Sequence, residues 1–277
     1  MGDGKFRIGI VAPASRIEPA LAAHVTALAA RIYPGRAELV FHPQCFLANG
    51  HFAGDDAARA DAFLEIANDP GFDALWVARG GYGSNRILAR VLPALNGAAK
   101  AKTYFGYSDA GFVLGALYGR GFCVAHGPLP ADLRRQGGDA AVTRALRWLM
   151  ERAPDALEPS LDGRPTAAFN LTILSHLIGT PFMPDLSDHV LMVEDVDEHH
   201  YRIDRALFHV TAALPKLAGL RLGRCSAIPD NDPAFGQDEV AIARHWCAQS
   251  GIAYLGRADI GHDVDNKVVP FGCPPLR

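Results

Sequence analysis

Short apolar runs alternate with longer stretches of helical periodicity through the first half of the chain. Runs of apolar and β-branched residues bounded by polar ones are typical of buried strands. They occur at 6–12, 37–41, 74–78, 102–105 and 122–125. Apolar residues spaced three or four positions apart predict helices between them, at 17–32, 55–68 and 112–118. This repeated alternation predicts an α/β fold with a parallel sheet and helices on both faces.

The alternation stops after a predicted helix at 142–152. Residues 151–165 contain several prolines and acidic residues without periodicity, so we place a linker there, between a domain at 1–150 and a second at 166–277. The second half has an apolar segment at 169–178 and a mixture of strands and helices. They are expected at 189–193, 201–214, 238–249, 252–255 and 267–269. We therefore predict a smaller α/β domain at the carboxyl end.

The composition narrows the class of protein. With 277 residues, 49% of them hydrophobic, the chain can bury a large core in one or two domains. Its net charge is -3, and Lys and Arg are scattered, which argues against a nucleic acid or a membrane surface as partner. The amino-terminal residues lack the apolar core of a signal peptide, and no run approaches a membrane span. We expect a cytoplasmic protein that acts on a small molecule or a peptide.

The five cysteines do not suggest a metal site or a disulfide framework. Their number is odd, they lie far apart, and no two are arranged as C-x-x-C. We expect buried free thiols at all five positions. They are Cys45, Cys123, Cys225, Cys247 and Cys273.

Ser108 lies where a predicted strand turns abruptly into a helix. The strand ends at Phe105 and the apolar helix occupies 112–118. A serine at such a turn, called a nucleophile elbow, presents its hydroxyl beside the free N–H groups of the helix. Gly106 permits the tight backbone, while Ala110 replaces the second glycine of G-x-S-x-G. The alternative is a serine that only caps its own helix.

A glycine-rich loop at 79–86 follows the strand at 74–78. A dinucleotide motif would begin at Gly81 and Gly83, but its third glycine is replaced by Arg86, so a nucleotide-dependent enzyme is disfavoured. Glycines at a strand end do leave backbone N–H groups accessible, as in an oxyanion hole. The alternative is a turn that needs positive φ angles.

Two further segments carry candidate chemistry. Glu194 directly follows the apolar run at 189–193, where a carboxylate would be partly buried and would need a hydrogen-bond partner. His262 follows a glycine and comes after the strand at 252–255. Metal ligation by His199 and His200 is disfavoured, because adjacent side chains diverge and no third ligand has a suitable spacing.

Ser108, Glu194 and His262 each lie beyond the carboxyl end of a predicted strand. Ligands gather at that edge of open α/β sheets. A serine, a basic histidine and a carboxylate that orients the histidine make up a catalytic triad, which occurs in several chain orders. We therefore expect these three side chains to converge.

Beyond this, the sequence resembles the LD-carboxypeptidases, a family that also contains the microcin C immunity peptidases. Ordered matches to the family's motifs extend through most of the chain. They are Val11–Ser15, Phe52–Asp56, Arg79–Gly83, Gly106–Asp109, His126–Pro128, Leu177–Pro181, Glu194–Val196, Tyr201–Arg205 and Gly261–His262. The resemblance implies a Rossmann or flavodoxin-like first domain and a second α/β domain with a swivelling, β-barrel-like part.

It further implies that Ser108 is the nucleophile, His262 the base and Glu194 the orienting acid of a serine carboxypeptidase. The implied reaction releases terminal D-alanine from a murein tetrapeptide, in peptidoglycan recycling, with no metal or other cofactor and in a homodimer. The N–H groups of Gly81 and Asp109 would bind the oxyanion. Substrate binding is assigned to Arg79, Tyr82 and Asn170.

One departure from the family pattern concerns the cleft. Where the family has G-G-N-L, this chain has Ala168, Phe169, Asn170 and Leu171. Larger side chains at two glycine positions are expected to narrow or reshape the substrate cleft. An amidase that acts on aminoacyl-nucleotide conjugates and a non-catalytic ligand-binding protein are the alternative functions.

Overall fold

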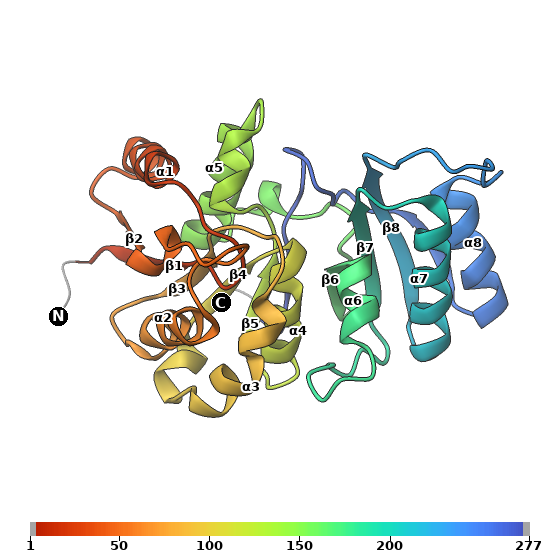
Figure 1. Ribbon diagram of the computed structural model, residues 1–277, viewed down its shortest axis with the longest axis horizontal. Helices are drawn as coiled ribbons and strands as arrows, with labels where there is room; N and C mark the ends of the chain where they lie inside the picture. Colours follow the sequence, from red (N-terminus) through yellow and green to blue (C-terminus); the bar gives the residue numbers. More distant parts are fainter. Residues whose placement is uncertain (1–3, 274–277) are drawn as a thin grey trace.

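Two separate sheets organise the chain (Figure 1). In this computed structural model, which describes residues 4–273, the first sheet has the order β10-β5-β4-β3-β1-β2 and the second β6-β7-β8-β9. All neighbours are parallel except β10 and β5, so the predicted α/β class is confirmed. The strands are β1 (Phe6–Val11), β2 (Ala37–Phe41), β3 (Ala74–Val77), β4 (Thr103–Gly106), β5 (Cys123–His126), β6 (Thr166–Asn170), β7 (Val190–Val196), β8 (Gly219–Ser226), β9 (Tyr254–Arg257) and β10 (Val269–Phe271).

Helices cover both faces of the first sheet, as the alternation predicted. On one face pack α1 (Pro19–Ile32) and α5 (Gly138–Glu151). On the other face pack α2 (Asp56–Asn68), α3 (Leu88–Val91) and α4 (Gly111–Tyr118). Side chains of β3 alternate between the two cores, because successive residues of a strand point to opposite faces.

The second sheet has its helices on one face. They are α6 (Leu171–Leu177), α7 (His200–Ala213) and α8 (Glu239–Ser250). A small cluster that includes Met192, Ile260 and Val269 covers the other face, where the segment after β9 crosses the sheet. This segment carries His262 and continues into β10, which pairs with β5 of the first sheet.

The two sheets share one hydrophobic core at the contact of α4 with α6. Gly115 makes this contact possible: a Cβ at this position would lie 2.7 Å from Cδ2 of Leu177 and 3.2 Å from Phe169. A side chain at this position would therefore require the packed Leu177 and Phe169 side chains to shift. Phe169 is 1% exposed and also contacts Phe271 of β10.

The predicted elements differ from the observed ones in several places: α3 was not predicted, and β9 and β10 each begin two residues after the predicted start. Helix α5 begins at Gly138, four residues before the predicted start, because the preceding Gly137 adopts a left-handed conformation that lets the chain turn into the helix. The apolar segment 169–178 contains the end of β6 and then α6, joined without any loop. The strand predicted at 189–193 extends to Val196, and β8 was not predicted.

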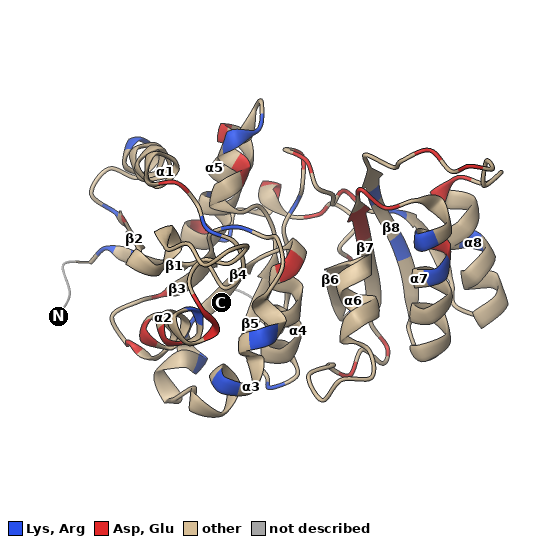
Figure 2. Ribbon diagram, in the orientation of Figure 1, with Lys and Arg blue, Asp and Glu red and all other residues tan. Residues whose placement is uncertain are grey.

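The domain division at 151–165 stays a prediction, and β10 shows that the second half returns to the first sheet. The second sheet is open within residues 4–273: its outer strands β6 and β9 do not pair, so these residues do not form the expected barrel-like part. Lys and Arg are interspersed with Asp and Glu in both halves of the chain (Figure 2). None of the described helices has the length and apolar composition that a membrane span needs.

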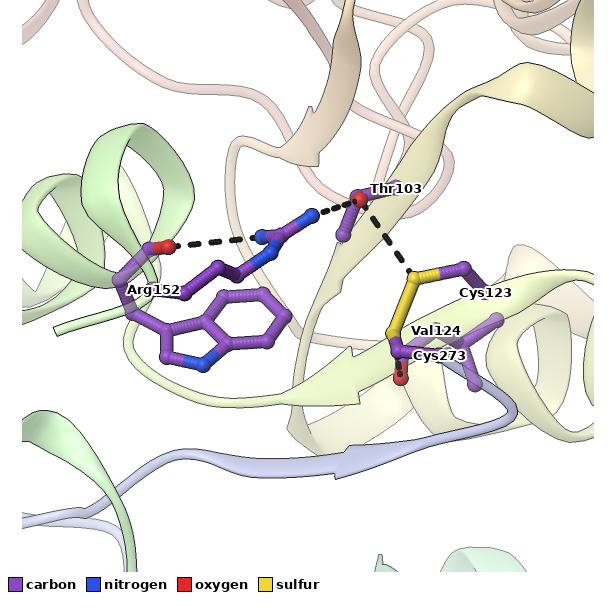
Figure 3. Close-up of a disulfide and its surroundings, with 6 residues drawn as sticks. Thr103, Cys123, Val124, Arg152 and Cys273 are labelled. Carbon is purple, nitrogen blue, oxygen red and sulfur yellow. Dashed lines mark hydrogen bonds between the residues drawn. A yellow bond between two sulfur atoms is a disulfide. The ribbon is translucent and has the colours of Figure 1, made fainter. Parts of the chain in front are cut away.

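The expectation of five free thiols is wrong for two cysteines. Cys123, at the start of β5, and Cys273, two residues after β10, form a disulfide between positions 150 residues apart (Figure 3). Cys45, Cys225 and Cys247 are free. Disulfides persist mainly in oxidising compartments, so this bond does not favour the expected cytoplasmic location, which stays a prediction.

Breaking this disulfide should destabilise the protein, because it closes a long loop and fixes β10 against β5. We expect reduction, or the double substitution Cys123→Ser and Cys273→Ser, to lower the free energy of unfolding by about 2–5 kcal/mol. Urea unfolding with and without reductant measures this difference. Reductant should not destabilise the double variant further. Equal stability of the oxidised and reduced wild-type proteins would contradict the prediction.

Candidate functional site

Ser108 occupies a sharp turn between β4 and α4, as predicted. Its φ angle is +62°, a left-handed conformation that a residue with a side chain rarely adopts. A single 3-10 turn at Ser108–Ala110 leads into α4. Gly80 makes room for the turn, since a Cβ there would lie 2.7 Å from the Ser108 hydroxyl oxygen. The backbone strain and the close packing fix the position of this hydroxyl.

The structure brings the three predicted side chains together. Nε2 of His262 lies 3.1 Å from Oγ of Ser108, and Nδ1 of His262 lies 2.5 Å from Oε2 of Glu194. Glu194 is 0% exposed, and its other oxygen, Oε1, has no hydrogen-bond partner among the described residues. It lies inside β7, whose end carries the acidic pair of Glu194 and Asp195 (Figure 2).

Burial and charge act in opposite directions on His262. Burial disfavours the imidazolium, but the charge of Glu194 and its hydrogen bond favour it, so the pKa of His262 is raised above its usual value. The neighbouring Asp195 is also buried, and burial together with the charge of Glu194 raises its pKa to about 6. The charge of the Glu194 carboxylate thus acts to raise the pKa values of two neighbouring groups, Asp195 and His262.

A buried hydrogen-bond network holds the loop of His262 against the first sheet. Oδ1 of Asn266 accepts from the backbone N–H of Gly261 at 3.2 Å and from Nε2 of His126 at 3.1 Å. Complete burial lowers the pKa of His126 to about 4, so it is neutral near pH 7. The Tyr107 ring packs 4.9 Å from the His262 ring. Sequence reasoning missed Asn266, because no local pattern distinguishes it.

Asp109 has a second role that the sequence analysis did not assign. Its buried carboxylate accepts hydrogen bonds from the N–H groups of Gly83 at 3.2 Å and Ser84 at 2.9 Å. The Ser84 hydroxyl donates to the Asp109 carbonyl oxygen at 2.6 Å. Burial raises the pKa of Asp109, and these hydrogen bonds oppose the rise. The glycine-rich loop is thus fixed to the turn that carries Ser108.

A cavity of ≈ 330 Å³ opens beside Ser108. The residues that line it are Arg79, Gly80, Gly81, Tyr107, Ser108, Leu129, Ala131, Asp132, Arg134, Arg135 and His262. Gly81, one of the two expected oxyanion donors, has a φ angle of +113°, and a Cβ there would collide with Ser15. Arg79, which the sequence analysis assigned to substrate binding, also lines this cavity.

The other two expected substrate-binding residues do not line this cavity. Tyr82 is 48% exposed and packs near Phe52. Asn170 is buried: its Nδ2 donates to Asp195 at 2.8 Å, and its Oδ1 caps α6. A role for either in substrate binding stays a prediction. Phe169 lies in the shared core and outside the lining, so its bulk does not narrow the cavity as expected.

No group of three or more His, Cys, Asp or Glu side chains suited to a metal ion occurs among residues 4–273. His199 stacks on Tyr201, and His200 stacks on Phe235. The two adjacent histidines therefore pack against different aromatic partners, in keeping with the expectation that their side chains diverge.

Serine hydrolases share this geometry. A serine at a strained strand-to-helix turn is hydrogen-bonded to a histidine, and the histidine is hydrogen-bonded to a buried carboxylate. Comparison with known proteins leads to a narrower class. Residues 8–127 match the LD-carboxypeptidase N-terminal domain, and residues 165–274 match the LD-carboxypeptidase C-terminal domain. The chain belongs to the LD-carboxypeptidase family, as its motifs suggested, and is a carboxypeptidase.

Individual relatives agree with this assignment. A putative carboxypeptidase of Synechocystis is 31% identical over 247 residues, which are 85% of this chain and 79% of the relative. The crystal structure of muramoyltetrapeptide carboxypeptidase from Oxalobacter formigenes has a TM-score of 0.76 and 26% identity, covering 95% of this chain and 92% of that one. MccF in complex with glutamyl sulfamoyl guanosine has a TM-score of 0.77 at 16% identity, covering 100% and 98%, and shares the fold.

The pKa of His262 tests whether the Glu194 carboxylate acts on this imidazole. We expect its imidazole to titrate above its usual pKa of 6.5 in the wild-type protein. In Glu194→Gln it should titrate at a lower pH than in the wild-type protein, because burial is then opposed only by the smaller effects of Asp195 and Asp132. NMR spectra of the imidazole, assigned with His262→Gln, measure both pKa values.

Glu198→Gln is the matched control, since Glu198 pairs with Arg202 outside the site. This variant should leave the His262 titration unchanged. If Glu194→Gln also leaves it unchanged, the carboxylate does not stabilise the imidazolium.

Proposed function

We propose that this carboxypeptidase hydrolyses an L,D peptide bond and releases the terminal D-alanine of a murein tetrapeptide. The observation that carries the proposal is the hydrogen-bonded line of Ser108, His262 and Glu194 at a cavity. Ser108 is the nucleophile, His262 the general base and then acid, and Glu194 the residue that orients the imidazole.

The reaction proceeds in two halves. Oγ of Ser108 attacks the scissile carbonyl carbon while its proton passes to Nε2 of His262, 3.1 Å away. The tetrahedral intermediate collapses as the amine of D-alanine leaves with that proton, and an ester to Ser108 remains. A water molecule then gives a proton to His262 and attacks the ester, and the proton returns to Oγ when the shortened peptide leaves.

Charge stabilisation comes from two groups. The N–H groups of Gly81 and Asp109 are proposed to bind the oxyanion, and Asp109 fixes the loop of Gly81 through Gly83 and Ser84. Glu194 stabilises the imidazolium that forms when His262 accepts the proton. Because only the neutral imidazole accepts this proton, kcat/KM should fall as the pH decreases through the raised pKa of His262.

Two observations support a short murein peptide as the substrate: the similarity to a named carboxypeptidase and the volume of the cavity. The similar protein of Oxalobacter formigenes is named a muramoyltetrapeptide carboxypeptidase. A cavity of ≈ 330 Å³ suits the end of a short peptide. A role in peptidoglycan recycling, a cytoplasmic location and a homodimer stay predictions.

Ser108→Ala should abolish release of D-alanine while the fold is retained. Loss of a triad serine costs on the order of a million-fold in rate. Mass spectrometry of defined muropeptides after incubation measures the products, and an aminoacyl-nucleotide conjugate assayed in parallel tests the amidase alternative. Ser175→Ala is the matched control, because its hydroxyl bonds His209 and lies outside the cavity.

A fluorophosphonate probe should label the wild-type protein and Ser175→Ala but not Ser108→Ala. More than a trace of turnover by Ser108→Ala would rule out Ser108 as the nucleophile. Tight binding of a muropeptide by the wild-type protein without any turnover would instead indicate a binding protein.

A further inference from the structure

Three arginines line the cavity beside Ser108, and they differ in how their charge is balanced. Nε of Arg135 donates to Oδ1 of Asp132 at 3.1 Å, an ion pair. Arg79 and Arg134 have no carboxylate within ion-pair distance among the described residues. Their side chains donate instead to backbone carbonyl oxygens, Arg79 to that of Arg16 at 3.1 Å and Arg134 to that of Ala131 at 3.3 Å.

These two guanidinium groups are close enough to repel each other. Burial lowers the pKa of Arg79, and the nearby charges of Arg134 and Arg16 lower it further. Arg16 pairs with Glu18 at 3.3 Å. Within the described part of the chain, Arg79 and Arg134 are therefore the guanidinium groups of the cavity wall that have no carboxylate partner. An anion bound between them would relieve the repulsion and accept hydrogen bonds from both.

The apolar part of the cavity wall indicates which chemical group lies next to the anionic group of the ligand. Leu129 and Ala131 supply a small apolar surface, and Ser108 lies in the same cavity. In a peptide that loses its terminal residue, the carboxylate is separated from the scissile nitrogen by one carbon atom. A terminal alanine places a carboxylate and a methyl group next to the bond that Ser108 attacks.

We propose that Arg79 and Arg134 together bind the terminal carboxylate of the substrate, and that Leu129 and Ala131 contact the side chain of the residue released. The inference rests on the proposed function and deepens it. Arg134 then determines specificity for a free carboxyl terminus, and a peptide with a blocked terminus is a poor ligand.

Binding measurements on Ser108→Ala test the proposal without turnover. Calorimetry compares the murein tetrapeptide, the same peptide with a terminal carboxamide, and a third peptide in which only the other carboxylates are amidated. We expect the terminal carboxamide to bind about 10- to 100-fold more weakly than the free acid, as for a lost charge-assisted hydrogen-bonded pair. The third peptide should bind like the free acid.

Adding Arg134→Met should bring the affinities of the free acid and the carboxamide close together, and Arg134→Lys should restore part of the difference. Arg134 is exposed, so its substitution should not prevent folding. Arg90→Met, which removes a surface arginine paired with Asp61, is the matched control and should keep the full preference.

Equal binding of the free acid and the carboxamide by Ser108→Ala would overturn the proposal, as would a loss of affinity only with the third peptide. The assay of D-alanine release by the wild-type protein separates this failure from a failure of the proposed function. A preference for the free acid that depends on Arg134, in a protein that releases no D-alanine, would support the carboxylate site and contradict the hydrolytic function.

Discussion

The contact between the two sheets is the constraint on which the site depends. Ser108 follows a strand of the first sheet, whereas Glu194 lies in a strand of the second, so any change in their relative placement would separate them. Two features hold the sheets together: a shared core between α4 and α6, and the return of the chain through β10 to β5. Because His262 lies on the segment between β9 and β10, both of its ends are anchored, one on each sheet.

The same contact explains how a buried carboxylate is tolerated. Glu194 is removed from solvent, and among residues 4–273 its carboxylate hydrogen-bonds His262 alone. An isolated buried charge is costly, and an opposite charge within hydrogen-bond distance offsets much of that cost. The Glu194 carboxylate therefore stabilises an imidazolium at His262, and this positive charge in turn offsets the cost of burying the carboxylate. The strained φ angle of Ser108 is a second local cost at the same site, as is common where function requires a fixed geometry.

Local patterns predicted much of the structure. The strand, the turn and the apolar helix around Ser108 are contiguous, so the elbow was visible in the sequence. Their positions after predicted strands singled out Glu194 and His262, and the motif resemblance agreed with that choice. The structure places both in one hydrogen-bonded line with Ser108. Features that depend on distant parts of the chain were missed or wrong. The disulfide joins positions 150 residues apart, and Asn266 acquires its partner His126 only through the pairing of β10 with β5. Neither has a local signature.

The departure from the family pattern at Ala168 and Phe169 shows why a motif difference needs a structure. Both side chains are buried, Phe169 in the shared core and Ala168 in the small cluster on the opposite face of β6. The bulk added at Phe169 is accommodated at the bare surface of α4 that Gly111 and Gly115 provide, where an added Cβ would lie within 3.5 Å of the Phe169 ring. Phe169 therefore contributes to the packing between the two sheets and does not itself line the cavity. The charged side chains that do line the cavity are Arg79, Arg134 and Arg135 with the carboxylate of Asp132, so recognition of a substrate by its charge depends on these positions and not on Phe169.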